Sequence, residues 1–177
     1  MEGVERYKVR LLPHNEKWAE EFERVRAMLR QAWGENVLDI EHVGSTAIPA
    51  IPAKPVLDIA VMVKSLEHLD IEALTHRGYD FRGYQNESKT RVLFVLRGER
   101  QISLQHIHCY SKDDPDFYRQ VGFRDYLNAH PDAAEEYAAL KRTLSERYPD
   151  DRASYTKGKA EFILRICRRL DCWGESI

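Results

Sequence analysis

The residues best suited to chemistry are Gly44, Ser45, Thr46 and Asp58. Gly44 permits a tight turn or the close approach of a ligand. Ser45 and Thr46 add hydroxyl and backbone N–H groups of the kind that bind anions at a helix N-terminus. Asp58 is a carboxylate within an apolar segment, where it needs a cation, a metal ion or several hydrogen-bond donors. The pattern suggests an anion-binding turn beside a carboxylate that binds a cation.

A purely structural interpretation of the same residues is equally open. Ser45 and Thr46 would then cap a helix, and Asp58 would pair with Lys54 or with an arginine. The spacing of the carboxylate after the Gly-Ser turn favours a functional role for these residues. The low specificity of short motifs favours the structural role.

Two further candidates are His106 and His108, which lie two residues apart in a predicted strand and therefore face the same way. Imidazoles in this arrangement can ligate a metal ion, contact phosphate or act as a general base near neutral pH. Hydrogen-bonded structural histidines are the alternative. For His42, just before the glycine turn, the structural interpretation is preferred.

The elements that must position these residues indicate an α+β (mixed α/β) class. Helical spacing of hydrophobic residues predicts a first helix between Asn15 and Gly34, and a β-branched run predicts a buried strand over 56–63. Further strands are expected at 5–11, 79–84, 90–96 and 101–110, with a helix over 65–77. From Asp114 onward, prolines at helix starts predict a helical part over about 114–170.

Length and composition predict one globular domain spanning 1–177. There is no apolar run of about 20 residues and no secretory signal, and the three cysteines form no CxxC pair. We therefore expect a cytoplasmic protein without a membrane partner. The net charge of −2 argues against nucleic acid as the partner. The oligomeric state is not determined by the sequence.

Several segments together resemble the GrpB (UPF0157) family. The stretch Glu41-His42-Val43-Gly44-Ser45-Thr46-Ala47-Ile48-Pro49, followed by Lys54-Pro55-Val56-Leu57-Asp58-Ile59, is similar to its signature, EHVGSTA-P and then KP--DI. Similar segments also occur at 12–18, 106–108, 123–127, 137–141 and 155–159. The resemblance covers roughly residues 7–168 and places the chain in the nucleotidyltransferase superfamily.

This resemblance implies a nucleotidyltransferase-like mixed sheet with flanking helices and a C-terminal helical cluster. In the superfamily, a Gly-Ser turn holds nucleotide phosphates, which implies this role for Gly44, Ser45 and Thr46. Two carboxylates spaced D-x-D on the next strand, often joined by a third from a later strand, hold divalent metal ions. These ions clamp the attacking and leaving oxygens during transfer. Asp58 matches the first carboxylate.

The second carboxylate position is Ala60, which puts a standard two-metal site in doubt. The expected face of the 101–110 strand carries His106 and His108 where the family pattern would place the third carboxylate. The divalent cofactor could be Mg²⁺ or Mn²⁺. An ion held by Asp58 with His106 or His108 would favour Mn²⁺, Zn²⁺ or Ni²⁺ over Mg²⁺, because imidazole is a softer ligand than carboxylate.

Basic residues outnumber acidic ones nine to four between residues 141 and 170. Such an excess is usually a solvated helix face. Alternatively, some of these residues line a cleft opposite the Gly-Ser turn and bind polyphosphate. The phosphate-binding candidates in addition to the turn are Lys54, Arg91, Arg124, Lys141, Tyr155 and Lys159.

Three functions are consistent with these observations. The first is a nucleotidyltransferase-like protein that binds a nucleotide or other phosphate ligand and transfers a nucleotidyl group to an unknown acceptor, with Asp58, His106 and His108 at the catalytic centre. The alternative is a non-catalytic nucleotide-binding or accessory protein on a degenerate transferase scaffold. A hydrolase that acts on phosphate esters is the third. The missing carboxylate leaves open whether the protein is an enzyme.

Overall fold

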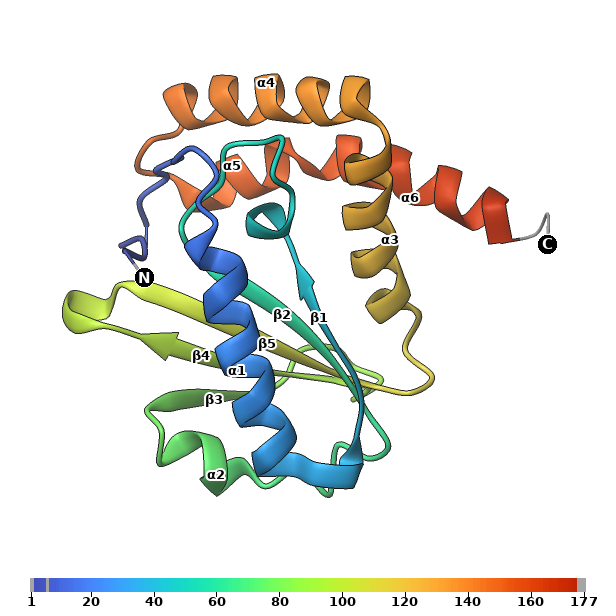
Figure 1. Cartoon of the computed structure of the whole chain (residues 1–177). Helices are drawn as coiled ribbons and strands as arrows, with labels where there is room; N and C mark the ends of the chain where they lie inside the picture. Colours follow the sequence, from blue (N-terminus) through green and yellow to red (C-terminus); the bar gives the residue numbers. More distant parts are fainter. Residues whose placement is uncertain (1, 6, 175–177) are drawn as a thin grey trace.

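Five strands form one mixed sheet in the order β1-β2-β5-β4-β3 (Figure 1). The computed structural model describes residues 2–5 and 7–174. Strands β2 and β5 run parallel, and the other neighbouring pairs are antiparallel. The strands are β1 (Val37–Val43), β2 (Leu57–Val63), β3 (Tyr79–Tyr84), β4 (Arg91–Arg97) and β5 (Ser103–Ser111).

Six α-helices are present in the described part of the chain. Their bounds are α1 (Lys17–Trp33), α2 (Ile71–Thr75), α3 (Pro115–Ala129), α4 (Pro131–Arg147), α5 (Arg152–Gly158) and α6 (Ala160–Gly174). Short 3₁₀ helices occupy Gly34–Asn36, Ser45–Ala47 and Glu99–Gln101. Asp114 caps α3 by accepting a hydrogen bond from the backbone N–H of Asp116, as the Asp-Pro pair predicts.

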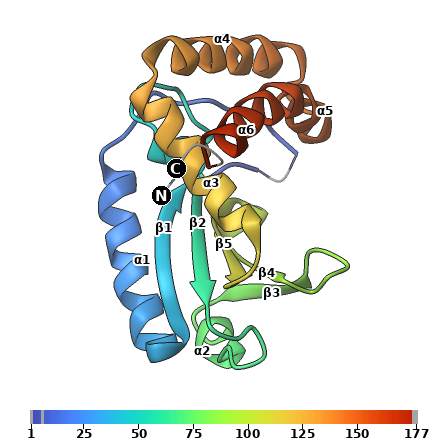
Figure 2. The same cartoon turned by 90° about the vertical axis from the view of Figure 1, so that its right-hand side faces the viewer.

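The two faces of β2 carry different chemistry, because successive side chains on a strand point in opposite directions. Leu57, Ile59 and their alternating neighbours pack against α1 in the main hydrophobic core. Ala60 and Met62, on the other face, pack with Phe117 from α3. Figure 2 shows α1 on one side of the sheet and the C-terminal helices on the other. Asp58 lies on this second face, where its side chain is partly exposed.

The C-terminal helices form a second core over the end of the sheet where β1 ends and β2 begins (Figure 1). Ile48 and Ile51, from the loop between these strands, are buried with Tyr137, Phe162 and other residues of α3, α4 and α6. The mixed α/β class and the C-terminal helical cluster are therefore confirmed. None of the helices in the described part of the chain has the length and hydrophobicity needed to cross a bilayer.

Three expected elements differ in the structure. The described residues of 5–11 form no strand. Isolated bridges at Val4 and Leu12 flank the segment, and the Val9 N–H donates to the carbonyl of Pro149 rather than to a neighbouring strand. The helix expected over 65–77 is confined to α2, where the Asp70 side chain caps the N-terminus. The last helix is broken near Lys159 into α5 and α6.

Candidate functional site

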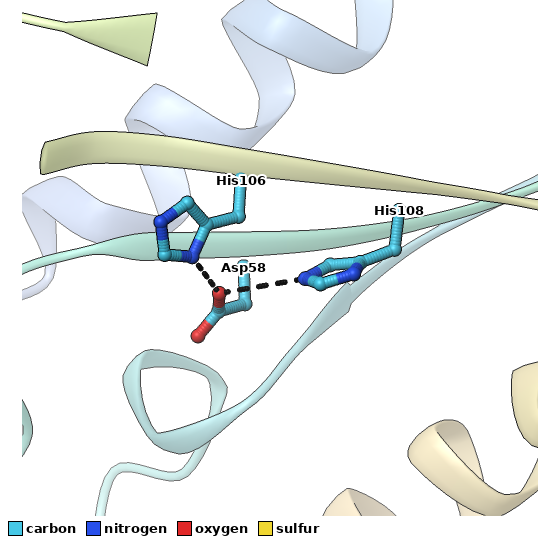
Figure 3. A group of neighbouring side chains, drawn as sticks. All are labelled: Asp58, His106 and His108. Atoms are coloured by element: carbon cyan, nitrogen blue, oxygen red, sulfur yellow. Dashed lines mark hydrogen bonds and ion pairs between the residues drawn. The ribbon is translucent and has the colours of Figure 1, made fainter. Parts of the chain in front are cut away.

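Asp58, His106 and His108 form one cluster on the open face of the sheet (Figure 3). The parallel register sets Asp58 beside His106 and Ala60 beside His108. His106 Nδ1 lies 2.9 Å from Asp58 Oδ1, and His108 Nε2 lies 3.9 Å from the same oxygen. One possible ligand atom from each residue lies within 4.8 Å of the other two. This donor set, two nitrogens and one oxygen, suits a single divalent ion of the imidazole-preferring type.

The protonation of Asp58 is governed by the two imidazoles. Burial raises the pKa of this carboxyl, but the hydrogen bond with His106 and the closeness of His108 outweigh burial and hold the pKa well below its usual range. The Asp58 side chain is nevertheless 32% exposed, so the carboxylate is both ionised and accessible from outside. It can therefore accept a cation without first losing a proton.

Gly44 brings the turn against Asp58. Strand pairing places Val43 opposite Asp58, and Gly44 follows with a φ of 70°. A Cβ at residue 44 would lie 2.7 Å from Asp58 Oδ2, so any side chain here would have to displace the Asp58 carboxylate. Ser45 comes next, at the start of a 3₁₀ helix, and lines the same cleft as Tyr137 from α4. The turn thus joins the carboxylate to the C-terminal helices.

A cleft of about 670 Å³ lies beside this cluster, between the open sheet face and the helices. It brings together most of the predicted site residues: Gly44, Ser45, Lys54, Asp58, Arg91, His106, His108, Lys141, Tyr155 and Lys159. Among the described residues that line it, eight are lysine or arginine and three are aspartate or glutamate. The whole chain has a net charge of −2. The cleft is therefore a local cationic site on a slightly acidic protein.

Three lysines meet around two tyrosines at one end of the cleft. Lys54 Nζ and Lys159 Nζ lie 5.3 Å and 4.6 Å from the ring centroid of Tyr155. Lys141 Nζ donates a hydrogen bond to the carbonyl oxygen of Pro52 and lies 5.3 Å from the Tyr137 ring centroid. Such cation–π contacts hold an ammonium group in place without neutralising its charge.

Burial lowers the pKa values of all three lysines. Burial, together with the charges of Lys159 and Lys54, lowers the pKa of Lys141 to about 6. Burial is also the main cause for Lys54 and Lys159, whose pKa values fall to about 8. The structure therefore collects cations that repel one another, a condition that a bound anion would relieve.

Two predicted phosphate-binding residues are not brought to the cleft. Thr46 is buried, and its hydroxyl is hydrogen-bonded to His42 Nε2 at 2.9 Å. Arg124 contacts the Glu41 carboxylate and the backbone carbonyl of His42. Their partners on β1 turn both side chains away from the cleft. His42 stacks on Phe22, and burial lowers its pKa to about 4, as expected for a structural histidine.

The cleft also has lining residues that the sequence did not suggest for the site. Arg119 and Gln120 line it from α3, and Arg152 and Arg168 line it from α5 and α6. Helical spacing could have revealed Arg119 and Gln120, because residues 116, 119, 120 and 123 repeat at intervals that place them on one helix face.

Comparison with known proteins gives a consistent result. A family model described as "GrpB protein" matches residues 8–169. UPF0157 protein YqkA of Bacillus subtilis is 38% identical over 158 residues, which are 88% of this chain and 45% of that protein. Glutamate-rich protein GrpB of Alkalihalophilus pseudofirmus is 35% identical over 176 residues, covering 96% of this chain and 100% of that one. The chain thus spans less than half of the first relative and the whole of the second.

Solved structures share the fold. The crystal structure of conserved protein GrpB from Enterococcus faecalis has a TM-score of 0.83 and 31% identity, covering 90% of this chain and 96% of that one. Cid1, solved in complex with its short product ApU, has a TM-score of 0.53 and 11% identity, covering 77% of this chain and 43% of that one. Cid1 is a poly(U) polymerase. At 11% identity the likeness concerns the fold alone.

Proposed function

The chain belongs to the GrpB family, and from that premise we propose that it binds a nucleotide or another phosphate-containing small molecule in the cleft. The observation that carries the proposal is the group of Lys54, Lys141 and Lys159 beside the Gly44–Ser45 turn. Buried lysines with lowered pKa values are costly unless an anion pairs with them. A polyphosphate would supply that charge, and Cid1 supports the nucleotide class through the shared fold.

The same cleft offers a place for one divalent ion. The residues do not fit the two-metal arrangement of the superfamily, because Ala60 replaces the second carboxylate and β5 presents histidines beside it. They do fit one ion held by Asp58 with one or both histidines, and Mn²⁺, Zn²⁺ or Ni²⁺ would suit this donor set better than Mg²⁺. Such an ion would supply positive charge beside the phosphates.

In the catalytic form of the proposal, the protein transfers a nucleotidyl group. An acceptor hydroxyl attacks the α-phosphorus, the bond to the bridging oxygen breaks, and pyrophosphate leaves. The proton of the acceptor hydroxyl passes to His106, whose Nδ1 is hydrogen-bonded to Asp58. In this form of the proposal Asp58 and His108 would hold the ion, because His106 must stay free to act as the base. The lysines stabilise the charge on the departing pyrophosphate.

A non-catalytic binding protein is the second candidate, and Ala60 is the observation that favours it. Without the second carboxylate, the cleft retains its cations but loses the group that positions a second metal ion. The two candidates share the ligand and differ only in whether a product is formed.

Calorimetric titration with ATP, GTP, CTP and UTP in the presence of Mn²⁺ tests the binding. We expect at least one nucleotide to bind in the micromolar to millimolar range, and Lys159→Gln to weaken binding about tenfold, a loss of roughly 1.4 kcal/mol. Lys64→Gln is the matched control, since Lys64 is exposed and does not line the cleft. Absence of binding by the unmodified protein would end the proposal.

Mass spectrometry then separates the two candidates. The protein is incubated with the bound nucleotide, Mn²⁺ and a cell extract, beside Asp58→Ala. A product heavier by one nucleotide, absent with Asp58→Ala, supports transfer. Binding without a product under any metal supports the non-catalytic role.

A further inference from the structure

The cleft has an apolar wall beside its lysines. Phe123 of α3 and Ile163 and Leu164 of α6 all line the cleft, where the two helices pack against each other. Phe123 and Ile163 are half-buried and pack against the C-terminal core, whereas Leu164 is 56% exposed. Ligand sites in proteins typically combine apolar surface of this kind with a few charged groups. The apolar wall is therefore a candidate part of the site.

The helical repeat of α6 places the wall next to Lys159. The Ile163 N–H donates to the carbonyl oxygen of Lys159, so the two residues lie one helical turn apart, about 5.4 Å along the axis. Side chains four residues apart share a helix face, and Leu164 follows directly. Along this face the cleft therefore changes from a cation to hydrocarbon surface within a single turn.

Ring contacts connect the wall with a second lysine. The Lys141 Nζ lies 5.3 Å from the ring centroid of Tyr137, and the Phe123 ring centroid lies 5.5 Å from the same centroid. Tyr137 also lines the cleft. Lysines and apolar wall are thus adjacent on α4 and α3 as well as along α6, and one small molecule can contact both.

We propose that the apolar wall binds an uncharged apolar or aromatic group of the same ligand whose phosphates contact the lysines. This inference rests on the proposed function and adds the substrate class, a phosphate ester that carries a nucleobase or a hydrocarbon chain. Such a group removes the wall from water when it binds. Inorganic polyphosphate has no such group, and it would leave Leu164 in contact with water.

Calorimetric titration with two matched pairs of ligands tests the assignment. ATP is compared with inorganic tripolyphosphate, and geranyl diphosphate with inorganic pyrophosphate, so that the members of each pair have phosphate chains of equal length. We expect at least one organic ligand to bind about tenfold more tightly than its inorganic partner, a difference of roughly 1.4 kcal/mol. The pair with the larger difference shows whether the wall takes a base or a hydrocarbon.

Two substitutions separate the wall from the lysines. Leu164→Asn should remove most of the tenfold advantage and leave the binding of the inorganic ions unchanged, whereas Lys159→Gln should weaken the binding of all four ligands. Leu38→Asn is the matched control, since Leu38 is also an exposed leucine, at 43%, and does not line the cleft.

Equal affinities within both pairs would overturn the inference and leave the phosphate site in place. An equal effect of Leu164→Asn on organic and inorganic ligands would do the same. Failure of all four ligands to bind would refute the wall together with the proposed function. Two further measurements on ligand-free protein check other occupants. A dimer that Leu164→Asn dissociates in sedimentation equilibrium would assign the wall to a second copy. A melting temperature that falls more in Leu164→Asn than in Leu38→Asn would assign it to the chain itself.

Discussion

The carboxylate of Asp58 occupies the space in which a side chain at residue 44 would begin. The Cβ of any other residue at Gly44 would lie 2.7 Å from Asp58 Oδ2, and the φ of 70° is itself unfavourable for residues with a Cβ. The turn and the carboxylate are therefore one geometric unit, held together by the pairing of Val43 with Asp58.

Substituting Gly44→Ala should displace Asp58 as well as strain the turn. The backbone strain alone costs about 1–3 kcal/mol, because φ 70° with ψ −170° is a region that essentially only glycine occupies, and the contact with Asp58 adds to it. Gly83→Ala is the matched control, because Gly83 has the same φ and nothing within 4 Å of the added Cβ. Urea denaturation should show a larger loss of unfolding free energy for Gly44→Ala than for Gly83→Ala. The Gly44→Ala variant should also bind metal more weakly. Equal losses would mean that Asp58 moves aside freely.

Removing any member of the Asp58 cluster should weaken binding of a divalent ion. Changes to residues behind the ligands typically cost 10–100-fold in metal affinity, so loss of a ligand should cost about 100-fold or more. The absorption spectrum of bound Co²⁺ would report Asp58→Asn, His106→Ala and His108→Ala, with the exposed His68→Ala as control. Normal binding by His106→Ala alone would leave His106 free to act as the base. Normal binding by all three variants would refute the metal site.

Replacing Lys141 by methionine should stabilise the ligand-free protein. Lys141 is 1% exposed, and burial among Lys159 and Lys54 lowers its pKa to about 6, so the unfolded chain binds a proton that the folded protein does not. The expected gain is roughly 1–4 kcal/mol, the range seen when buried charges are replaced by apolar side chains. The gain should be largest near pH 6 and shrink toward pH 10, where the unfolded lysine also loses its proton. Thermal unfolding at both pH values measures this difference.

Phosphate binding should be linked to proton uptake. At pH 7 the Lys141 amine, with a pKa of about 6, is mostly neutral, while Lys54 and Lys159, with pKa values of about 8, are mostly charged. A bound polyphosphate favours the protonated lysines, so affinity should fall by roughly tenfold per pH unit above pH 8 for each proton taken up. Calorimetry in buffers of different ionisation enthalpy counts these protons. An affinity that does not change between pH 6 and pH 9 would contradict the linkage.

Much of the site follows from local pattern alone. The two-residue repeat of a strand predicts that His106 and His108 share a face, and it separates Asp58 from Leu57 and Ile59 on β2. The structure agrees with both expectations. That these faces meet depends on the parallel pairing of β2 with β5, which joins segments 48 residues apart. The GrpB resemblance, rather than periodicity, carried this part of the prediction.

The errors concern side chains whose hydrogen-bond partners could not be read from the sequence pattern. Thr46 and Arg124 have the right chemistry for a phosphate site. In the structure, however, Thr46 is hydrogen-bonded to His42 and Arg124 to Glu41, both on β1. The alternation at 5–11 is a valid strand pattern, yet its backbone hydrogen bond runs from Val9 to Pro149 and not to a strand of the sheet. Patterns of this kind describe what a residue can do, and tertiary contacts decide whether it does so.

Because the crowded lysines favour a bound anion, ligand binding should be measurable as a rise in the protein's melting temperature. Any anion that fills the cleft adds about 2.7 kcal/mol of stability at a concentration of 100 Kd, which for a chain of this size raises the melting temperature by roughly 5–10 °C. A panel of phosphorylated metabolites can therefore be ranked by heating alone, before any reaction is known. The molecule that raises the transition further in the presence of a saturating nucleotide is the first candidate for the acceptor.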